Sequence, residues 1–290
     1  MSLVSFVRVS NQEKDSMKEA IVRSLDLINF DFKSNLHSIL IKPNMCYYYH
    51  PSTGEITDPQ FVSAIVDILQ ERFNDPEISI VEADASAMKC KYAFPMLGYD
   101  RIAKENGIKL INLSKEESTK ISINIKGSKF DILIPNIFNK SDLIVNVPKI
   151  KYMDGVNISC ALKNMFGCNA NPGKYIYHKA LNDIIVQINK HINTDLVITD
   201  GIMVCGKYTK RLNMVMSSKD PVANDAAAST LMGLNPRSVK HLASASKNGV
   251  GSMEFNPVGD FNDFIIKFPK RGAKDNIRKL AASFYSRIFY

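Results

Sequence analysis

Hydrophobic positions along the chain follow two periods, one typical of buried strands and the other of amphipathic helices. Short apolar runs predict strands at residues 38–42, 77–82, 109–113, 143–147, 195–199 and 211–217. Apolar residues that recur every three or four positions predict helices at residues 60–73, 99–106, 181–191, 221–233 and 236–247. Strands separated by helices indicate βαβ units and a largely parallel sheet.

Local signals mark several helix ends. Asp58-Pro59 and Asp220-Pro221 each combine a good N-cap with a proline at the first helical position. Gly107 stands where a left-handed residue would end a helix. Residues 156–166 are also expected to be helical, which would place Ser159 and Lys163 on one face.

Residues 120–134 have a different pattern. Isoleucine recurs with period two up to Ile125, and residues 126–129 are typical of a turn, so we expect an antiparallel hairpin. The predicted fold class is α/β, a largely parallel doubly wound sheet with helices on both faces and this inserted hairpin. We expect one domain at residues 1–258, with two lobes (1–140 and 141–258) as an alternative, and a basic tail or helix at 259–290.

Polar residues follow four of the predicted strands. In open parallel sheets, ligands bind outside the carboxyl ends of the strands, so these side chains are expected to meet at one edge. Clustered lysines there would bind a carboxylate or a phosphate and stabilise a developing oxyanion or enolate. The predicted substrate-binding residues are Lys42, Asn44, Lys149, Lys151, Ser159, Lys163 and Asn164.

Two further residues are candidates for proton transfer. His178 follows Gly173 and precedes a helix, and a histidine is the natural general base near neutral pH. Asp200 ends the strand at 195–199 and is the second catalytic candidate. Asp84 and Asp200 together could hold a divalent metal, or each could cap a helix. For His178 the alternative is a surface histidine without a catalytic role. For each lysine at a strand end the alternative is a solvated side chain that binds no ligand.

Charge and cysteine content narrow the partners. The 290 residues carry a formal net charge of +8, which favours small anions; the scattered basic residues give no strong nucleic-acid signal. Residues 260–290 supply +4 of this charge, and their helical apolar spacing predicts either docking on the body or peripheral membrane contact. Five dispersed cysteines predict free thiols, and the absence of a signal peptide or spanning segment predicts a cytoplasmic location.

Known phosphate-binding and cluster-binding motifs are missing from the sequence. It contains no GxGxxG loop, no GxxxxGK[ST] loop and no CxxC pair, so dinucleotide binding, Walker-type ATP binding and a ferredoxin module lack support. An iron–sulfur cluster within this chain is therefore not expected, and the cofactor is open.

Five phrases in order resemble the family called domain of unknown function 362. They begin with Leu40-Ile-Lys-Pro-Asn44 and include Val147-Pro-Lys-Ile-Lys151 and Ala161-Leu-Lys-Asn-Met-Phe-Gly167. The last two are Leu196-Val-Ile-Thr-Asp-Gly201 and Asp220-Pro-Val-Ala-Asn-Asp225, and the resemblance covers residues 38–252.

The resemblance implies a binding site more than a reaction. Many members of the family carry a ferredoxin-like module, which this chain lacks, and tend to have a histidine near the position of His178. A second histidine expected after the paired lysines is replaced here by Tyr152 and Met153. Three functions therefore stay open: an enzyme acting on a small anionic metabolite, a redox-linked protein working with an iron–sulfur partner, and a non-catalytic anion-binding protein.

Overall fold

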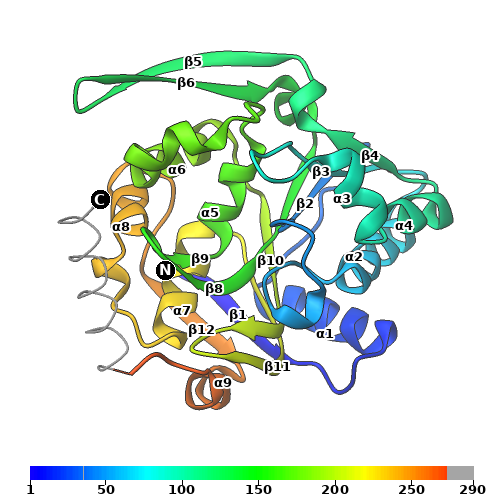
Figure 1. Cartoon of the computed structure of the whole chain (residues 1–290). Coiled ribbons are helices and arrows are strands. Elements are labelled where there is room, and N and C mark those ends of the chain that lie inside the picture. Colours follow the sequence, from blue (N-terminus) through cyan, green and yellow to red (C-terminus); the bar gives the residue numbers. More distant parts are fainter. Residues whose placement is uncertain (35, 273–290) are drawn as a thin grey trace.

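A large, mostly parallel sheet forms the centre of the molecule (Figure 1). The structure is a computed structural model that describes residues 1–34 and 36–272. The strands in spatial order are β12 (Phe255–Gly259), β1 (Ser2–Arg8), β11 (Thr209–Ser218), β10 (Leu196–Cys205), β7 (Leu143–Val147), β2 (Ser38–Pro43), β3 (Glu77–Glu82) and β4 (Lys109–Asn112). Only β11 runs antiparallel to its neighbours on this path through the described residues. The α/β fold class predicted from the sequence is confirmed.

Helices cover both faces of this sheet, because successive strand side chains point to opposite sides. In β2, Leu40 joins one hydrophobic core, whereas Ile39 and Ile41 join the other. One face carries α1 (Lys14–Leu27), α2 (Pro59–Arg72), α3 (Cys90–Met96) and α4 (Tyr99–Asn106). The other carries α5 (Ala161–Met165), α6 (Leu181–His191), α7 (Pro221–Leu231) and α8 (Lys240–Lys247).

The capping residues predicted at three helix ends are found at those ends in the structure. Asp58 accepts the backbone N–H of Gln60 at 2.9 Å and begins α2. Asp220 accepts the N–H groups of the second and third residues of α7 at 2.8 and 3.1 Å. Gly107 ends α4 at a φ of 65°, in the left-handed region.

The hairpin β5 (Ser118–Ile125) and β6 (Ser128–Pro135) forms a separate two-stranded sheet that projects from the body (Figure 1). Its turn places Lys126 and Gly127 at φ values of 51° and 80°, as a tight hairpin turn of the primed type requires. Strands on either side of the hairpin in sequence, β2 and β7, pair with each other. The division into one domain or two lobes stays a prediction.

The helix predicted at 156–166 is present only from Ala161, and its predicted start was wrong. Residues 149–153 and 157–159 form two more strands, β8 (Lys149–Met153) and β9 (Asn157–Ser159), and only then does the short helix α5 begin. Ser159 therefore lies on a strand and does not share a helical face with Lys163. The chain pairs β8 with β10, so the two lysines after β7 belong to the sheet.

Several elements were not predicted from the sequence. Near the ends of the chain they are β1, α1, β12 and α9 (Phe261–Lys267), whose Phe264 is fully buried, and in its first half α3. The described part also contains six 3₁₀ helices, at Pro51–Thr53, Leu113–Lys115, Asn136–Lys140, Phe166–Cys168, Lys174–Ala180 and Pro236–Ser238. The apolar stripe predicted for the tail, from Ile277 to Ile288, lies outside the described residues. Among residues 1–34 and 36–272, no helix is long and apolar enough to cross a membrane.

Candidate functional site

The carboxyl ends of β2 and β3 meet in a buried ion pair. Lys42 Nζ lies 2.8 Å from Glu82 Oε2 and also donates to the carbonyl oxygen of Pro43 at 2.6 Å. Both side chains are almost fully buried, with exposed fractions of 1% and 3%. Gly167 packs against this pair so closely that an added Cβ would lie 3.2 Å from both Lys42 Nζ and Glu82 Oε1.

A second ion pair joins β8 to β10. Lys149 Nζ lies 3.0 Å from Asp200 Oδ1, and both side chains are completely enclosed. Asp200 also accepts the backbone N–H groups of Asp58 at 2.8 Å and Ile202 at 3.0 Å. Asp200 is therefore held by three donors, and it anchors the loop before α2 to the sheet.

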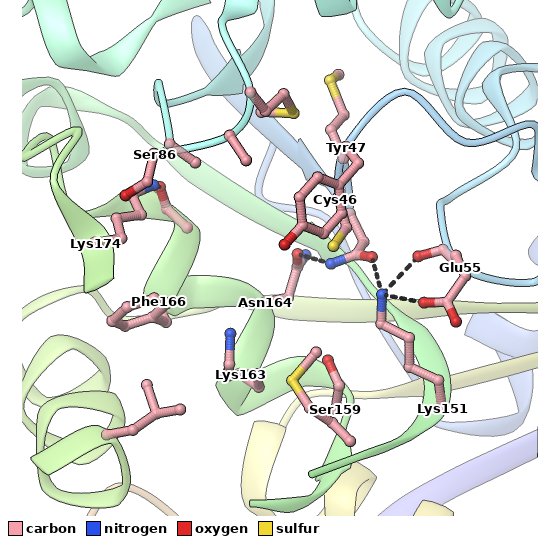
Figure 2. A pocket seen from close by; sticks show the side chains of 18 of the residues that line it. Cys46, Tyr47, Glu55, Ser86, Lys151, Ser159, Lys163, Asn164, Phe166 and Lys174 are labelled. Atoms are coloured by element: carbon pink, nitrogen blue, oxygen red, sulfur yellow. Dashed lines mark hydrogen bonds and ion pairs between the residues drawn. The ribbon is translucent and has the colours of Figure 1, made fainter. Parts of the chain in front are cut away.

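A third pair lies nearer the surface. Lys151 Nζ lies 3.1 Å from Glu55 Oε2, and it donates to Glu55 O at 2.7 Å and to Asn44 Oδ1 at 3.3 Å (Figure 2). Asn44 in turn donates to Asn164 Oδ1 at 3.0 Å, and Asn164 donates to Asn146 Oδ1 at 2.8 Å. This chain of amides ties β2, β7, β8 and α5 together at the strand ends.

A cavity of about 610 Å³ opens beside these pairs. Its wall includes the predicted catalytic residue His178 and six of the seven predicted substrate-binding residues: Lys42, Asn44, Lys151, Ser159, Lys163 and Asn164. Lys149, Asp84 and Asp200 do not belong to the described residues that line it. These residues thus border one concave space, and their role in binding or catalysis stays a prediction.

The cavity wall holds more positive than negative charge. Its cations are Lys42, Lys151, Lys163, Lys174 and Arg271, and its carboxylates are Glu55, Glu82 and Asp154. Glu82 pairs with Lys42, Glu55 with Lys151, and Asp154 lies 4.0 Å from Arg271. Within the described residues, no carboxylate lies within ion-pair distance of Lys163 or Lys174.

Lys163 is the side chain that points into the middle of the cavity (Figure 2). Its Nζ lies 4.5 Å from the centroid of the Phe166 ring. Burial lowers the pKa of Lys163 to about 8, and the nearby charges of Lys151, Lys174 and Lys42 act in the same direction. The charged form of Lys163 is therefore destabilised in the cavity, and a bound anion would stabilise it.

Lys174 lies across the cavity from Lys163 (Figure 2). Its exposed fraction is 7%, and its Nζ donates to the carbonyl oxygen of Gly167 at 2.7 Å. Burial lowers the pKa of Lys174 below that of an ordinary lysine, although Glu82 opposes the shift. One of its three N–H donors is engaged, which leaves two for a ligand.

His178 lines the cavity from the 3₁₀ helix at Lys174–Ala180. Its ring packs edge-on against Tyr175, with centroids 5.1 Å apart. Partial burial and the charge of Lys163 lower the pKa of His178, so its ring is neutral at pH 7 and can accept a proton. Cys46 and Tyr47 face the same space from the loop after β2.

Asp84 and Asp200, which were predicted as a metal-binding pair, each bind other groups of the protein. Asp84 accepts the N–H of Cys90 at 2.8 Å and lies 3.7 Å from Lys89, so it helps to begin α3. Asp200 binds Lys149 instead. In the part of the chain that the structure describes, no group of three or more histidine, cysteine or acidic residues could hold a metal ion.

Several residues of the site were missed by the sequence reading. Lys174 stands four residues before His178, and this spacing could have indicated that both side chains face the same site. Glu82, in contrast, ends a predicted strand, and the parallel pairing of β2 with β3 brings it beside Lys42. Glu55, Cys46 and Tyr47 lie in the irregular segment between β2 and α2, where no periodic pattern indicates orientation.

The chain is similar in sequence to a known protein and more distantly similar in structure to another. A thylakoid-associated protein of Synechocystis sp. is 22% identical over 293 residues, which cover 94% of this chain and 86% of that protein. The lactate racemase apoprotein from Thermoanaerobacterium thermosaccharolyticum is 14% identical with a TM-score of 0.46, over 81% of this chain and 58% of that one. The chain thus spans less than two thirds of the racemase, and a likeness this loose carries no functional argument.

The family model described as "Domain of unknown function (DUF362)" matches residues 39–230. The match begins in β2 and ends in α7, so it includes the three ion pairs and both lysines that face the cavity. Because these residues make up more than half of the chain, this protein belongs to the DUF362 family.

Proposed function

We propose that this protein is an enzyme that binds a small carboxylate or phosphate in the cavity, with Lys163 and Lys174 holding the anion and His178 moving a proton. The observation that carries the proposal is the charge balance of the wall. Three cation–carboxylate pairs leave Lys163 and Lys174 without a carboxylate among the described residues. Lys174 is buried and Lys163 is half-buried. Cations with so little contact with water are normally paired, and an anionic ligand would complete the set.

The other lysines have a supporting part in this proposal. Lys42 has two acceptors and Lys151 has three, and each set includes a carboxylate, so both lysines fix the shape of the wall. Asn44 and Asn164 hold Lys151 in register with α5 through their amides. Ser159 offers a hydroxyl from β9 to the ligand. Lys149 and Asp200 do not line the cavity; their ion pair joins β8 to β10. Proton transfer is therefore assigned to His178 alone.

The test is ligand binding by three methionine variants, since methionine keeps most of the lysine stem. Calorimetric titration with oxalate, lactate and inorganic phosphate would be run on wild type, Lys163→Met, Lys174→Met and the control Lys179→Met. Lys179 is exposed and lies in the same segment, but it is outside the cavity wall. Removing one charge-assisted contact is expected to weaken binding by about 1.5–3 kcal/mol, or roughly 10- to 150-fold.

Two outcomes would contradict the proposal. One is that none of the anions binds wild type, and the other is that Lys163→Met and Lys174→Met bind as tightly as the control. Binding without turnover in any assay, together with full dependence on both lysines, would support the non-catalytic alternative. A requirement for an iron–sulfur partner would support the redox-linked one.

A further inference from the structure

We propose that Lys163 is a nucleophile that forms an imine with the carbonyl carbon of a 2-oxo carboxylate, while Lys174 holds the neighbouring carboxylate. This inference rests on the proposed function, because the same cavity and the same two lysines are used. It adds a covalent step and a substrate class to what was so far a binding site.

The geometry distinguishes Lys163 from the other lysines of the wall. Lys42 and Lys151 each donate to a carboxylate and to at least one carbonyl oxygen, so their nitrogens have no lone pair to offer. Lys163 projects from α5 into open space over the apolar face of Phe166 (Figure 2). Within the described residues it has no carboxylate partner, and a nucleophilic amine needs that freedom.

The environment also supplies the reactive form of the amine. A pKa of about 8 means that about one tenth of Lys163 is neutral at pH 7. An ordinary lysine with a pKa near 10.5 would be neutral about 300 times less often. Burial among other cations is a recognised way to activate a lysine towards carbonyl compounds.

Lys174 selects the substrate class. Lys163 and Lys174 line the same cavity, and the charge of Lys174 contributes to the lowered pKa of Lys163. In a 2-oxo carboxylate the carbonyl carbon and the anionic group belong to one small molecule, so the substrate can offer a separate group to each lysine. Lys174 has two N–H donors left after its bond to Gly167, enough for a carboxylate.

The step balances without an oxidant or a further reactant. His178 takes one proton from the Lys163 ammonium, and the amine lone pair then forms the C–N bond while the carbonyl π electrons move to oxygen. One N–H proton passes to that oxygen, and the proton on His178 converts the hydroxyl into water as the C–O bond breaks. The sum is ammonium plus carbonyl giving protonated imine plus water.

The experiment is reductive trapping. Wild type would be incubated with pyruvate, 2-oxobutyrate or 2-oxoglutarate in the presence of sodium borohydride, followed by intact-mass measurement and peptide mapping. We expect one reduced adduct per chain on the peptide that contains Lys163, at least tenfold above any other lysine. Lactate, which has no carbonyl, should give none.

Variants separate the chemistry from the fold. Lys163→Arg keeps a cation of similar length but cannot form an imine, so it should melt as wild type does and give no adduct. Lys174→Met should lower the yield at limiting pyruvate by about tenfold, as expected for one lost charge-assisted contact. Lys179→Met should trap as wild type does.

Each result has a defined meaning. If none of the three oxo acids gives an adduct on Lys163, or if Lys163→Arg retains the adduct, the imine is wrong. If lactate and oxalate still bind with dependence on Lys163 and Lys174 in that case, the proposed function stands and only the covalent step falls. If neither adduct nor anion binding is found, both proposals fail together.

Discussion

Replacement of Lys149 by methionine tests whether the Lys149–Asp200 pair is structural. The pair is completely enclosed, and its N–O distance is 3.0 Å. Removing one partner of a buried pair leaves an uncompensated charge, which generally costs about 3–5 kcal/mol. Asp200 would keep two backbone N–H donors, at 2.8 and 3.0 Å, so we expect Lys149→Met to fall near the lower end, at about 3 kcal/mol.

The partner variant should cost more. Within the described residues Lys149 Nζ has Asp200 as its only acceptor, so Asp200→Asn leaves a buried ammonium with at best one neutral oxygen. We expect about 4–5 kcal/mol for this change. In the double variant both charges are gone, and its cost should be smaller than the sum of the single costs by about 2–3 kcal/mol.

The assay is urea unfolding followed by far-ultraviolet circular dichroism and tyrosine fluorescence, since the chain has 11 tyrosines and no tryptophan. Exposed Lys190→Met provides the matched control for the loss of one lysine. Single costs below about 1 kcal/mol that simply add in the double variant would refute the reasoning. That result would mean that water reaches the pair, and Asp200 would return as a candidate for proton transfer.

Three further changes test the packing and titration of the site and its surroundings. Gly167→Ala should destabilise the protein by about 1–3 kcal/mol in urea, because its Cβ would press on the Lys42–Glu82 pair; an unchanged midpoint would contradict this. Asp225, whose pKa burial raises to about 6, should contribute a loss of about 2–3 kcal/mol as the pH rises from 4 to 6; urea titrations measure it as a change in the stability difference between wild type and Asp225→Asn, and a constant difference would contradict it. His241 is fully buried, its pKa is lowered to about 4 by burial, and neither ring nitrogen has a partner within the described residues. As the pH falls from 6.5 to 4, wild type should therefore lose about 3 kcal/mol relative to His241→Leu; equal slopes for the two proteins would contradict the assignment.

The fold could be predicted where the local signal and the tertiary structure agree. The predicted strands 77–82 and 143–147 and helices 99–106 and 181–191 match the observed bounds, because each combines a clear period with a turn or cap at its ends. The first strand and helix carry comparable patterns: Met17, Ala20, Ile21, Ser24 and Leu25 form a buried stripe in α1. Those elements were recoverable from the sequence as well.

The helix predicted at 156–166 begins only at Ala161, and this later start has a tertiary cause. Asp225, from α7, accepts the N–H groups of Ala161 and Leu162 at 2.7 and 3.0 Å and so fixes the start of α5 there. The preceding residues pair with β8 instead, which turns Ser159 into a strand residue. Neither interaction has a signal within the segment itself, since Asp225 is more than sixty residues away.

The site was predicted to the extent that strand order determines it. A parallel sheet brings the ends of β2 and β3 to one edge, where Lys42 and Glu82 lie. Asp200, predicted to follow a strand, lies inside β10, which continues to Cys205, and it meets Lys149 of β8 there. Which lysine is neutralised could not be read from the sequence, because the carboxylates come from distant segments. Glu55 lies in a loop, yet it decides that Lys151 is paired.

The contrast between Lys149 and Lys163 ties stability to function. Both are lysines of the strand-end cluster, but one has a buried carboxylate and the other faces the cavity without one among the described residues. Folding lowers the pKa of Lys163 to about 8, so at pH 7 its charge opposes folding by at most about 3 kcal/mol. Lys163→Met should therefore raise the unfolding free energy of the ligand-free protein by about 1–2 kcal/mol after the lost contact with Phe166 is subtracted, whereas Lys149→Met lowers it. Urea unfolding of both variants at pH 7 measures the two signs, and destabilisation by both would show that Lys163 is paired for structure and that the anion site must be sought elsewhere.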